Sequence, residues 1–186
     1  MTRPNNMSSM TVEDRIRKAR EAFRLANDLQ LDLLTGTRVY DLLQRRLSEH
    51  HASETIEIGI RRMCLWYVIL TLSKWIEFYD KYKAFIPSEV QDEAADLRRV
   101  IEQRGIRDFR NNTVGHIWDD KTNMPLTIEE GQARVQSILG SEDIDGFMRW
   151  VNDPKENQFP RNVISIVERV RDGIKQANGF AATDLT

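Results

Sequence analysis

Apolar residues recur at every third or fourth position through the first part of the chain, which is the spacing of helices that bury one face. The pattern predicts a first helix over residues 11–34, with Thr11 as its N-cap and two acidic residues in the first turn, where they favour the helix dipole. Its buried face should consist of Ile16, Ala19, Phe23, Ala26, Leu29 and Leu33. The pattern resumes after Gly36 until the polar segment 49–53 breaks it. The apolar positions of this continuation are Val39, Leu42, Leu43 and Leu47.

A second long helix is predicted over residues 55–83, and its apolar residues cover more than half of its circumference. These residues are Ile58, Met63, Leu65, Trp66, Ile69, Leu72, Ile76 and Tyr79. Such a helix has neighbours on several sides, so we expect it at the centre of the fold. Its longest uncharged run, 63–73, is too short to cross a bilayer. Its aromatic residues have helical spacing, which favours a place in the core or in a dimer interface over a base-stacking platform.

Two shorter helices are predicted next. Ser88, followed three residues later by Gln91, is typical of a capping box that opens a third helix over residues 88–102. Gly105 should interrupt or bend the chain. Residues 106–118 are predicted to form a further helix, which carries more polar residues than the others.

The C-terminal part of the chain is predicted to be helical as well. Residues 119–126 have turn composition. Thr127 and Glu130 repeat the capping-box pattern and should begin a short helix that ends at residue 139. The last two helices are expected over 143–151 and 160–177. Pro160 suits the first turn of the last one, because a proline has no N–H to leave unpaired there.

These elements predict an all-α, single-domain fold of about six helices, with no strand indicated before residue 86. A length of 186 residues, with 40% apolar and 30% charged residues, fits one compact domain. We expect this domain over 11–177, between a flexible segment 1–10 and a frayed end 178–186. The single Cys64 excludes an intrachain disulfide, which favours a reducing cytoplasm, and the polar N-terminal segment lacks the apolar core of a signal peptide.

Charge and motif content exclude several classes of function. Lys and Arg number 27 against 29 Asp and Glu, so the net charge of −2 removes the usual basis for a dedicated duplex-DNA binder. Glycine loops that cradle phosphates are missing, which argues against nucleotide triphosphate hydrolysis. Metal-binding histidine pairs and serine nucleophile elbows are missing too, so neither a metal nor a cofactor is expected.

One segment stands apart because its composition works against a helix. Asparagine, threonine and glycine gather in residues 110–116, and each is a poor helix former by up to about 1 kcal/mol relative to alanine. Positions that break local preference are where function is expected. The segment begins with Arg110 and Asn111 and ends with Gly115 and His116, so five positions separate the arginine from the histidine.

This segment resembles the Arg-x4-6-His signature of the HEPN superfamily, all-helical proteins of prokaryotic toxin and abortive-infection systems and of several RNases. In that family a polar residue, often Asn, follows the arginine, and Asn111 holds that place here. The resemblance is strongest over 106–119 and extends loosely, as the order of helices, over most of the chain. It implies a HEPN-like helical bundle that forms a homodimer, in which two copies of the motif line one composite cleft.

The resemblance also implies a metal-independent endoribonuclease with a toxin or phage-defence role. His116 would act as general base or acid on the ribose 2′-OH and the leaving oxygen. Arg110 would clamp the scissile phosphate, and Asn111 would hold a phosphate oxygen or orient the arginine. Asn112 shares a helix face with His116 and, with Arg107 one turn before Arg110, would bind the substrate. The same spacing at Arg45–His50 and Arg46–His51 lacks these neighbours and predicts surface histidines.

Two alternatives stay open beside the nuclease. A non-catalytic HEPN dimer would bind RNA, nucleotide or a partner protein through the same cleft without cutting, and an accidental match would leave an ordinary helical adaptor. The slightly acidic charge favours a short or structured RNA target. HEPN toxins commonly have an antitoxin or a nucleotidyltransferase as partner, whereas no membrane association is expected.

Overall fold

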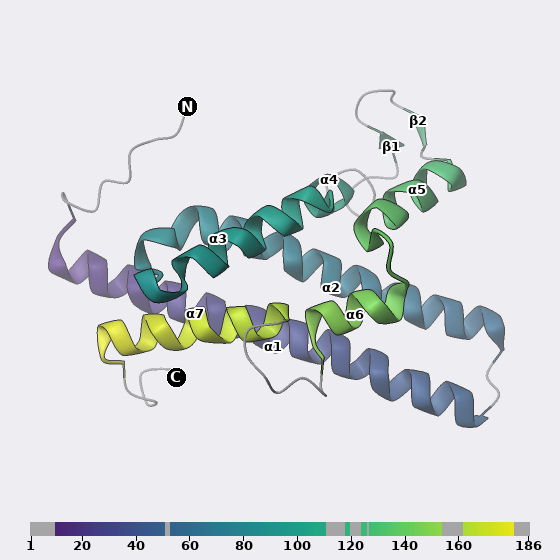
Figure 1. Cartoon of the computed structure of the whole chain (residues 1–186), viewed down its shortest axis with the longest axis horizontal. Coiled ribbons are helices and arrows are strands. Elements are labelled where there is room, and N and C mark those ends of the chain that lie inside the picture. Colours follow the sequence, from purple (N-terminus) through teal and green to yellow (C-terminus); the bar gives the residue numbers. More distant parts are fainter. Residues whose placement is uncertain are drawn as a thin grey trace.

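Two long antiparallel helices, α1 (Val12–His50) and α2 (Glu54–Tyr82), form the longest part of the protein (Figure 1). The computed structural model describes residues 10–50, 53–110, 118–119, 124–125, 127–153 and 162–180. Thr11 caps α1 as predicted, because its Oγ1 accepts the backbone N–H of Asp14 at 3.2 Å. The hairpin of these two helices is the frame on which the other helices pack.

The predicted break at Gly36 is wrong, because α1 continues through it to His50. Gly36 is buried against α2, where an added Cβ would lie 2.8 Å from Val68 Cγ2. The glycine therefore allows the two helices to approach each other, rather than ending the first one.

Several apolar residues predicted to be buried are exposed. Among them are Ile16, Val39 and Leu42 of α1 and Ile58 and Met63 of α2. All but Ile16 lie toward the end of the hairpin where α1 passes into α2, and in Figure 1 this end extends past α3 and α7. The other predicted core positions of the first helix, from Ala19 to Leu33, are buried.

Two helices cover one face of the hairpin. α7 (Val163–Asn178) packs on α1, α3 (Ser88–Gln103) packs on α2, and α3 and α7 pack on each other, so the four make a bundle (Figure 1). The core between them includes a run of aromatic rings from α2, with Trp75 stacked on Phe78 at 5.4 Å and Phe78 next to Tyr82 at 5.5 Å. The prediction of an all-α helical bundle is confirmed.

Helix starts follow local side-chain chemistry in some places and not in others. In α5 (Ile128–Leu139) the predicted capping box is confirmed, with Thr127 and Glu130 bonding each other's backbone N–H at 2.9 and 3.2 Å. The predicted box at Ser88 is wrong, because Pro87 holds the N-cap position of α3 and Ser88 is already helical.

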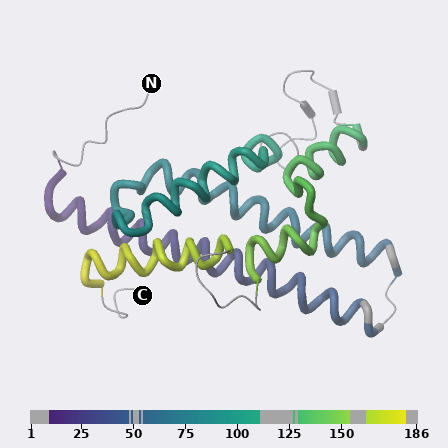
Figure 2. The backbone as a smooth tube through the Cα atoms, in the orientation of Figure 1, coloured from purple at the N-terminus to yellow at the C-terminus, as the bar shows by residue number. Residues whose placement is uncertain are grey.

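The last two helices begin at capping side chains. α6 (Ile144–Val151) starts after Asp143, whose carboxylate accepts the N–H of Gly146 at 2.7 Å. α7 starts at Val163 after Asn162, whose side chain accepts the N–H of Ser165 at 2.9 Å, so the predicted start at Pro160 is wrong. Figure 2 shows the chain passing from α5 through α6 before it reaches α7.

Short elements connect these helices. A 3-10 turn, η2 (Lys83–Phe85), follows α2, and a single helical turn, α4 (Ile106–Phe109), follows α3. Strands β1 (Trp118–Asp119) and β2 (Met124–Pro125) pair antiparallel, so the predicted helix does not extend to Trp118. Across the described ranges, none of the helices combines the length and apolarity needed to cross a membrane.

Candidate functional site

The α4 turn divides its side chains between the core and the surface. Ile106 and Phe109 are fully buried, whereas Arg107 and Arg110 reach over α2. Gly105 has a φ of 71°, a left-handed conformation that glycine adopts without strain, and it turns the chain out of α3. The glycine and the two buried residues therefore fix where the arginines point.

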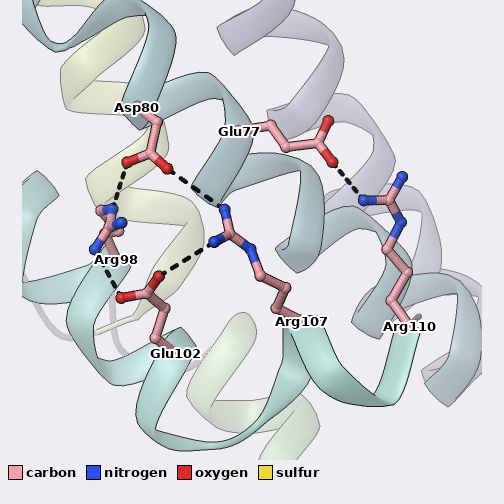
Figure 3. Close-up of polar contacts among 6 residues, drawn as sticks. All are labelled: Glu77, Asp80, Arg98, Glu102, Arg107 and Arg110. Atoms are coloured by element: carbon pink, nitrogen blue, oxygen red, sulfur yellow. Dashed lines mark hydrogen bonds and ion pairs between the residues drawn. The ribbon is translucent and has the colours of Figure 1, made fainter. Parts of the chain in front are cut away.

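Arg110 forms an ion pair with Glu77 of α2 (Figure 3). The side chains are 41% and 56% exposed, so water competes for both charges. Ion pairs of this exposure are worth about 0.2–1 kcal/mol. The guanidinium is therefore held near α2 but is available to a stronger anion.

Arg107 belongs to a closed network with Arg98 and two carboxylates (Figure 3). Arg98 contacts Asp80 and Glu102 at 2.7 Å each. Arg107 contacts the same two residues at 3.4 and 3.7 Å. The hydrogen bond to Asp80 raises the pKa of Arg98, so this guanidinium keeps its positive charge. The two positive and two negative charges of the network cancel, and the role of Arg107 in RNA binding stays a prediction.

The partners on α2 match the spacing of the two arginines. Glu77 and Asp80 are three positions apart, as are Arg107 and Arg110, so two ion pairs lie side by side between α2 and α4. These carboxylates were not among the predicted site residues, because α2 was interpreted mainly through its apolar residues. The available signal was this acidic pair at helical spacing near the C-terminal end of α2.

A groove of about 690 Å³ lies beside Arg110, between α1 and α2, and we call it the Arg110 groove. Its lining residues are Leu25, Asp28, Leu29, Asp32, Lys74, Glu77, Phe78, Lys81, Tyr82 and Arg110. Three of these side chains are acidic and three are basic. Lys74 binds Asp32 at 3.1 Å, and Tyr67 donates to the same carboxylate at 2.9 Å. The groove therefore carries balanced charges over a buried apolar floor.

Comparison with known proteins gives a fold and no family. No protein-family model matches this chain, and no curated protein matches it. Among solved structures it is similar to an integron cassette protein from the mobile metagenome of V. paracholerae, Vpc_cass2, with a TM-score of 0.67. The two chains are 18% identical, and the match covers 90% of this chain and 99% of that one. At this identity the similarity supports the helical fold alone.

The predicted catalytic residues are divided between the described and the remaining parts of the chain. Arg110 lies in the groove, at the end of α4. Asn111, Asn112 and His116 lie outside the described residues, so their placement stays a prediction. Of the motif, the structure therefore places Arg110, which directly follows α4.

Cys64 is the single thiol of the chain. It is buried in α2, and burial raises the pKa of the thiol, which favours its protonated, less nucleophilic form. Within the ranges that the structure describes, no three His, Cys, Asp or Glu side chains come together in a way that could hold a metal ion. A second groove, between the start of α3 and α7, lies away from the motif.

Proposed function

We propose that this protein is a metal-independent endoribonuclease of the HEPN type, with an active site composed of Arg110, Asn111 and His116 from two chains of a homodimer. The observation that carries the proposal is the position of Arg110, half-exposed at the edge of a groove and paired with a single exposed carboxylate. An arginine in this environment can exchange its partner for a phosphate. The all-α bundle supports the same proposal.

The chemistry follows from these side chains. His116 accepts the proton of a ribose 2′-OH, and the 2′ oxygen then attacks the adjacent phosphorus. The bond to the 5′ oxygen breaks, and this oxygen leaves with a proton that a protonated His116 donates. Arg110 offers two N–H donors to the phosphate oxygens, where negative charge accumulates. The products are a 2′,3′-cyclic phosphate and a 5′-hydroxyl, and DNA is inert because it lacks the 2′-OH.

A second chain solves a geometric problem of the motif. On a continuous helix, Arg110 and His116 would be about 9 Å apart along the axis and about 120° apart around it. One chain would then present them on different sides. Two facing copies bring an arginine and a histidine from opposite directions to the same phosphate, so neither chain is active alone.

The proposal includes a cellular setting. A short or structured RNA is the favoured target, because the net charge of −2 gives little attraction for a long polyanion. We place the activity in the cytoplasm, as a toxin or in phage defence, with an antitoxin or a nucleotidyltransferase as partner. The single, buried Cys64 is compatible with a reducing compartment.

Cleavage of total RNA in excess EDTA tests the proposal. The wild type should cut, whereas His116→Ala and Arg110→Ala at matched dimer content should not. Arg99→Ala is the matched control, because Arg99 is also an exposed arginine paired with one carboxylate, Asp96, but lies on α3. Intact RNA with the wild type, or equal cutting by the variants, would refute the nuclease.

A non-catalytic binding protein is the second candidate, favoured by the equal numbers of acidic and basic side chains in the groove. Such a protein would bind a labelled RNA hairpin in an anisotropy titration without cutting it. Arg110→Ala should then weaken binding, while Arg99→Ala leaves it unchanged.

A further inference from the structure

Exposed apolar side chains concentrate on one part of the molecule. Among the described residues, the large exposed ones are Val12, Ile16, Leu31, Val39, Leu42, Ile56, Ile58, Met63 and Tyr67. Seven of these nine lie on α1 and α2 between residues 31 and 67, the half of the hairpin that ends at the connection between the two helices. An apolar concentration of this kind marks an interaction surface.

Helical spacing places most of these side chains in two rows. Ile56, Met63 and Tyr67 are separated by seven and four positions, so they lie within about 20° of one line along α2. Leu31 and Leu42 are eleven positions apart and form such a row on α1. Ile58 does not belong to either row, because two positions of helix rotate it by about 200° from Ile56.

The two rows share one face of the hairpin. Tyr67 of the α2 row donates to Asp32, which directly follows Leu31 of the α1 row. Lys74, seven positions after Tyr67, binds the same carboxylate and lines the Arg110 groove. α3 and α7 cover other sides of the two helices, because both rows are exposed whereas the residues packed against α3 and α7 are buried. We call Leu31, Val39, Leu42, Ile56, Met63 and Tyr67 the apolar patch, and it is continuous with the Arg110 groove.

Charge along this face is complementary to a second copy of itself. On α1 the groove contributes acids, Asp28 and Asp32, and on α2 it contributes bases, Lys74 and Lys81, beside Glu77. A two-fold axis parallel to the hairpin would lay α1 of one copy on α2 of the other, at the same height. Two contacts within one chain show which residues of α1 and α2 lie at the same position along the hairpin, which we call their height. Lys74 lies level with Asp32, and Arg61 lies level with Gln44, which it contacts at 2.5 Å.

This axis places acidic side chains opposite basic ones and apolar side chains opposite apolar ones. At these heights Asp32 would face Lys74 of the partner subunit, and Leu42 would face Met63 of the partner subunit. A two-fold axis across the hairpin reverses one chain. It can pair the two apolar patches only by leaving both grooves outside the interface, and it can cover both only by placing the patch of one chain on the charged groove of the other. Burying unpaired charges against apolar side chains is costly, so the parallel axis, which covers patch and groove together, is favoured.

We propose that the apolar patch binds a second copy of this chain, with the two-fold axis parallel to the α1–α2 hairpin. The two Arg110 side chains then lie at the same position along the hairpin, each at the edge of its own groove. The inference rests on the proposed function only for this consequence, since the surface and its occupant are argued from exposure and charge.

Sedimentation velocity of the full chain tests the interface. The wild type should be a dimer, and Ile56→Glu and Met63→Glu should weaken the dimer by at least about tenfold, as expected for a charge placed in the centre of an interface. Ile58→Glu is the matched control, because Ile56 and Ile58 are 55% and 58% exposed on opposite sides of α2. It should leave the dimer unchanged, and far-UV circular dichroism should show all three variants to be folded.

A monomeric wild type at about 100 μM would overturn the second copy as the occupant and leave the patch to a different protein. Equal weakening by Ile56→Glu and Ile58→Glu would overturn the assigned face. RNA cleavage measured on the same samples separates this proposal from the nuclease. A dimer that weakens as described but never cuts RNA supports the interface and refutes the nuclease. A monomer that cuts refutes the interface and also the composite site of two chains, but leaves RNA cleavage itself standing.

Discussion

Replacing Gly36 with alanine should destabilise the protein, although alanine is the better helix former. Gly36 lies inside α1, buried where α1 and α2 come closest. The new Cβ would meet Val68 Cγ2 at 2.8 Å and Tyr67 Cδ1 at 3.0 Å. Val68 is fully buried and branched at Cβ, so its methyl group cannot rotate away without a clash elsewhere.

The expected size follows from two opposing terms. Gly→Ala in a helix interior gains about 0.5–1 kcal/mol. Inserting a methyl group into a well-packed interface costs about 1–3 kcal/mol. The midpoints of these two ranges leave a net loss of about 1 kcal/mol, which for a chain of this size lowers Tm by roughly 2–4 °C.

Thermal unfolding followed by circular dichroism measures this effect, with Gly59→Ala as the control. Gly59 is also inside a helix, but a Cβ added there meets no heavy atom within 4 Å. It should gain about 0.5–1 kcal/mol, so the two alanines should move Tm in opposite directions. A Gly36→Ala variant as stable as Gly59→Ala would show that the helices do not pack closely at this point.

Three further outcomes are expected. Glu77→Gln should free Arg110 and strengthen the binding of an RNA hairpin in an anisotropy titration. An exposed pair is worth up to about 1 kcal/mol, so the gain in affinity should be up to about fivefold. Unchanged affinity would show that the pair does not restrain the arginine. Thr127→Ala should remove the capping box of α5 and lower the free energy of unfolding by about 1 kcal/mol in urea, whereas no loss would mean that α5 does not depend on its cap. Burial and a hydrogen bond to Asp145 raise the pKa of the Tyr40 phenol well above its usual value. The folded state therefore favours the protonated phenol more than the unfolded state does, so the free energy of unfolding should fall as pH rises above about 10. Tyr40→Phe removes this phenol and should make the fall shallower in denaturant titrations at alkaline pH.

The helices were predictable because their signals are local. Apolar spacing located α2, α3, α5, α6 and α7 to within a few residues, and the caps at Thr11 and Thr127 depend on contacts over three positions of sequence. Prediction failed where the deciding partner is distant. The first helix was predicted to end before Gly36, but the helix continues and this glycine allows the approach of Val68, which lies on another helix.

The burial of side chains was likewise predictable only where local sequence decides it. Periodicity identifies the apolar side of a helix but not whether another helix covers it, so Met63 was predicted for the core although it is 61% exposed. The covering depends on where α3 and α7 end along the hairpin, which is a tertiary property. The exposed patch was therefore invisible in the sequence, although Val39, Leu42 and Met63 had been identified as apolar positions of their helices.

The sequence by itself determined the fold class, most helix positions and the choice of Arg110 as a candidate, because residue type and spacing carry that information. Only the tertiary structure decided what surrounds Arg110. Its partner Glu77 lies 33 positions away in the sequence, and the groove beside it is built from two helices that meet only when the hairpin closes. Pairing across such distances depends on how helices pack, since local preferences fix each helix but not its neighbours.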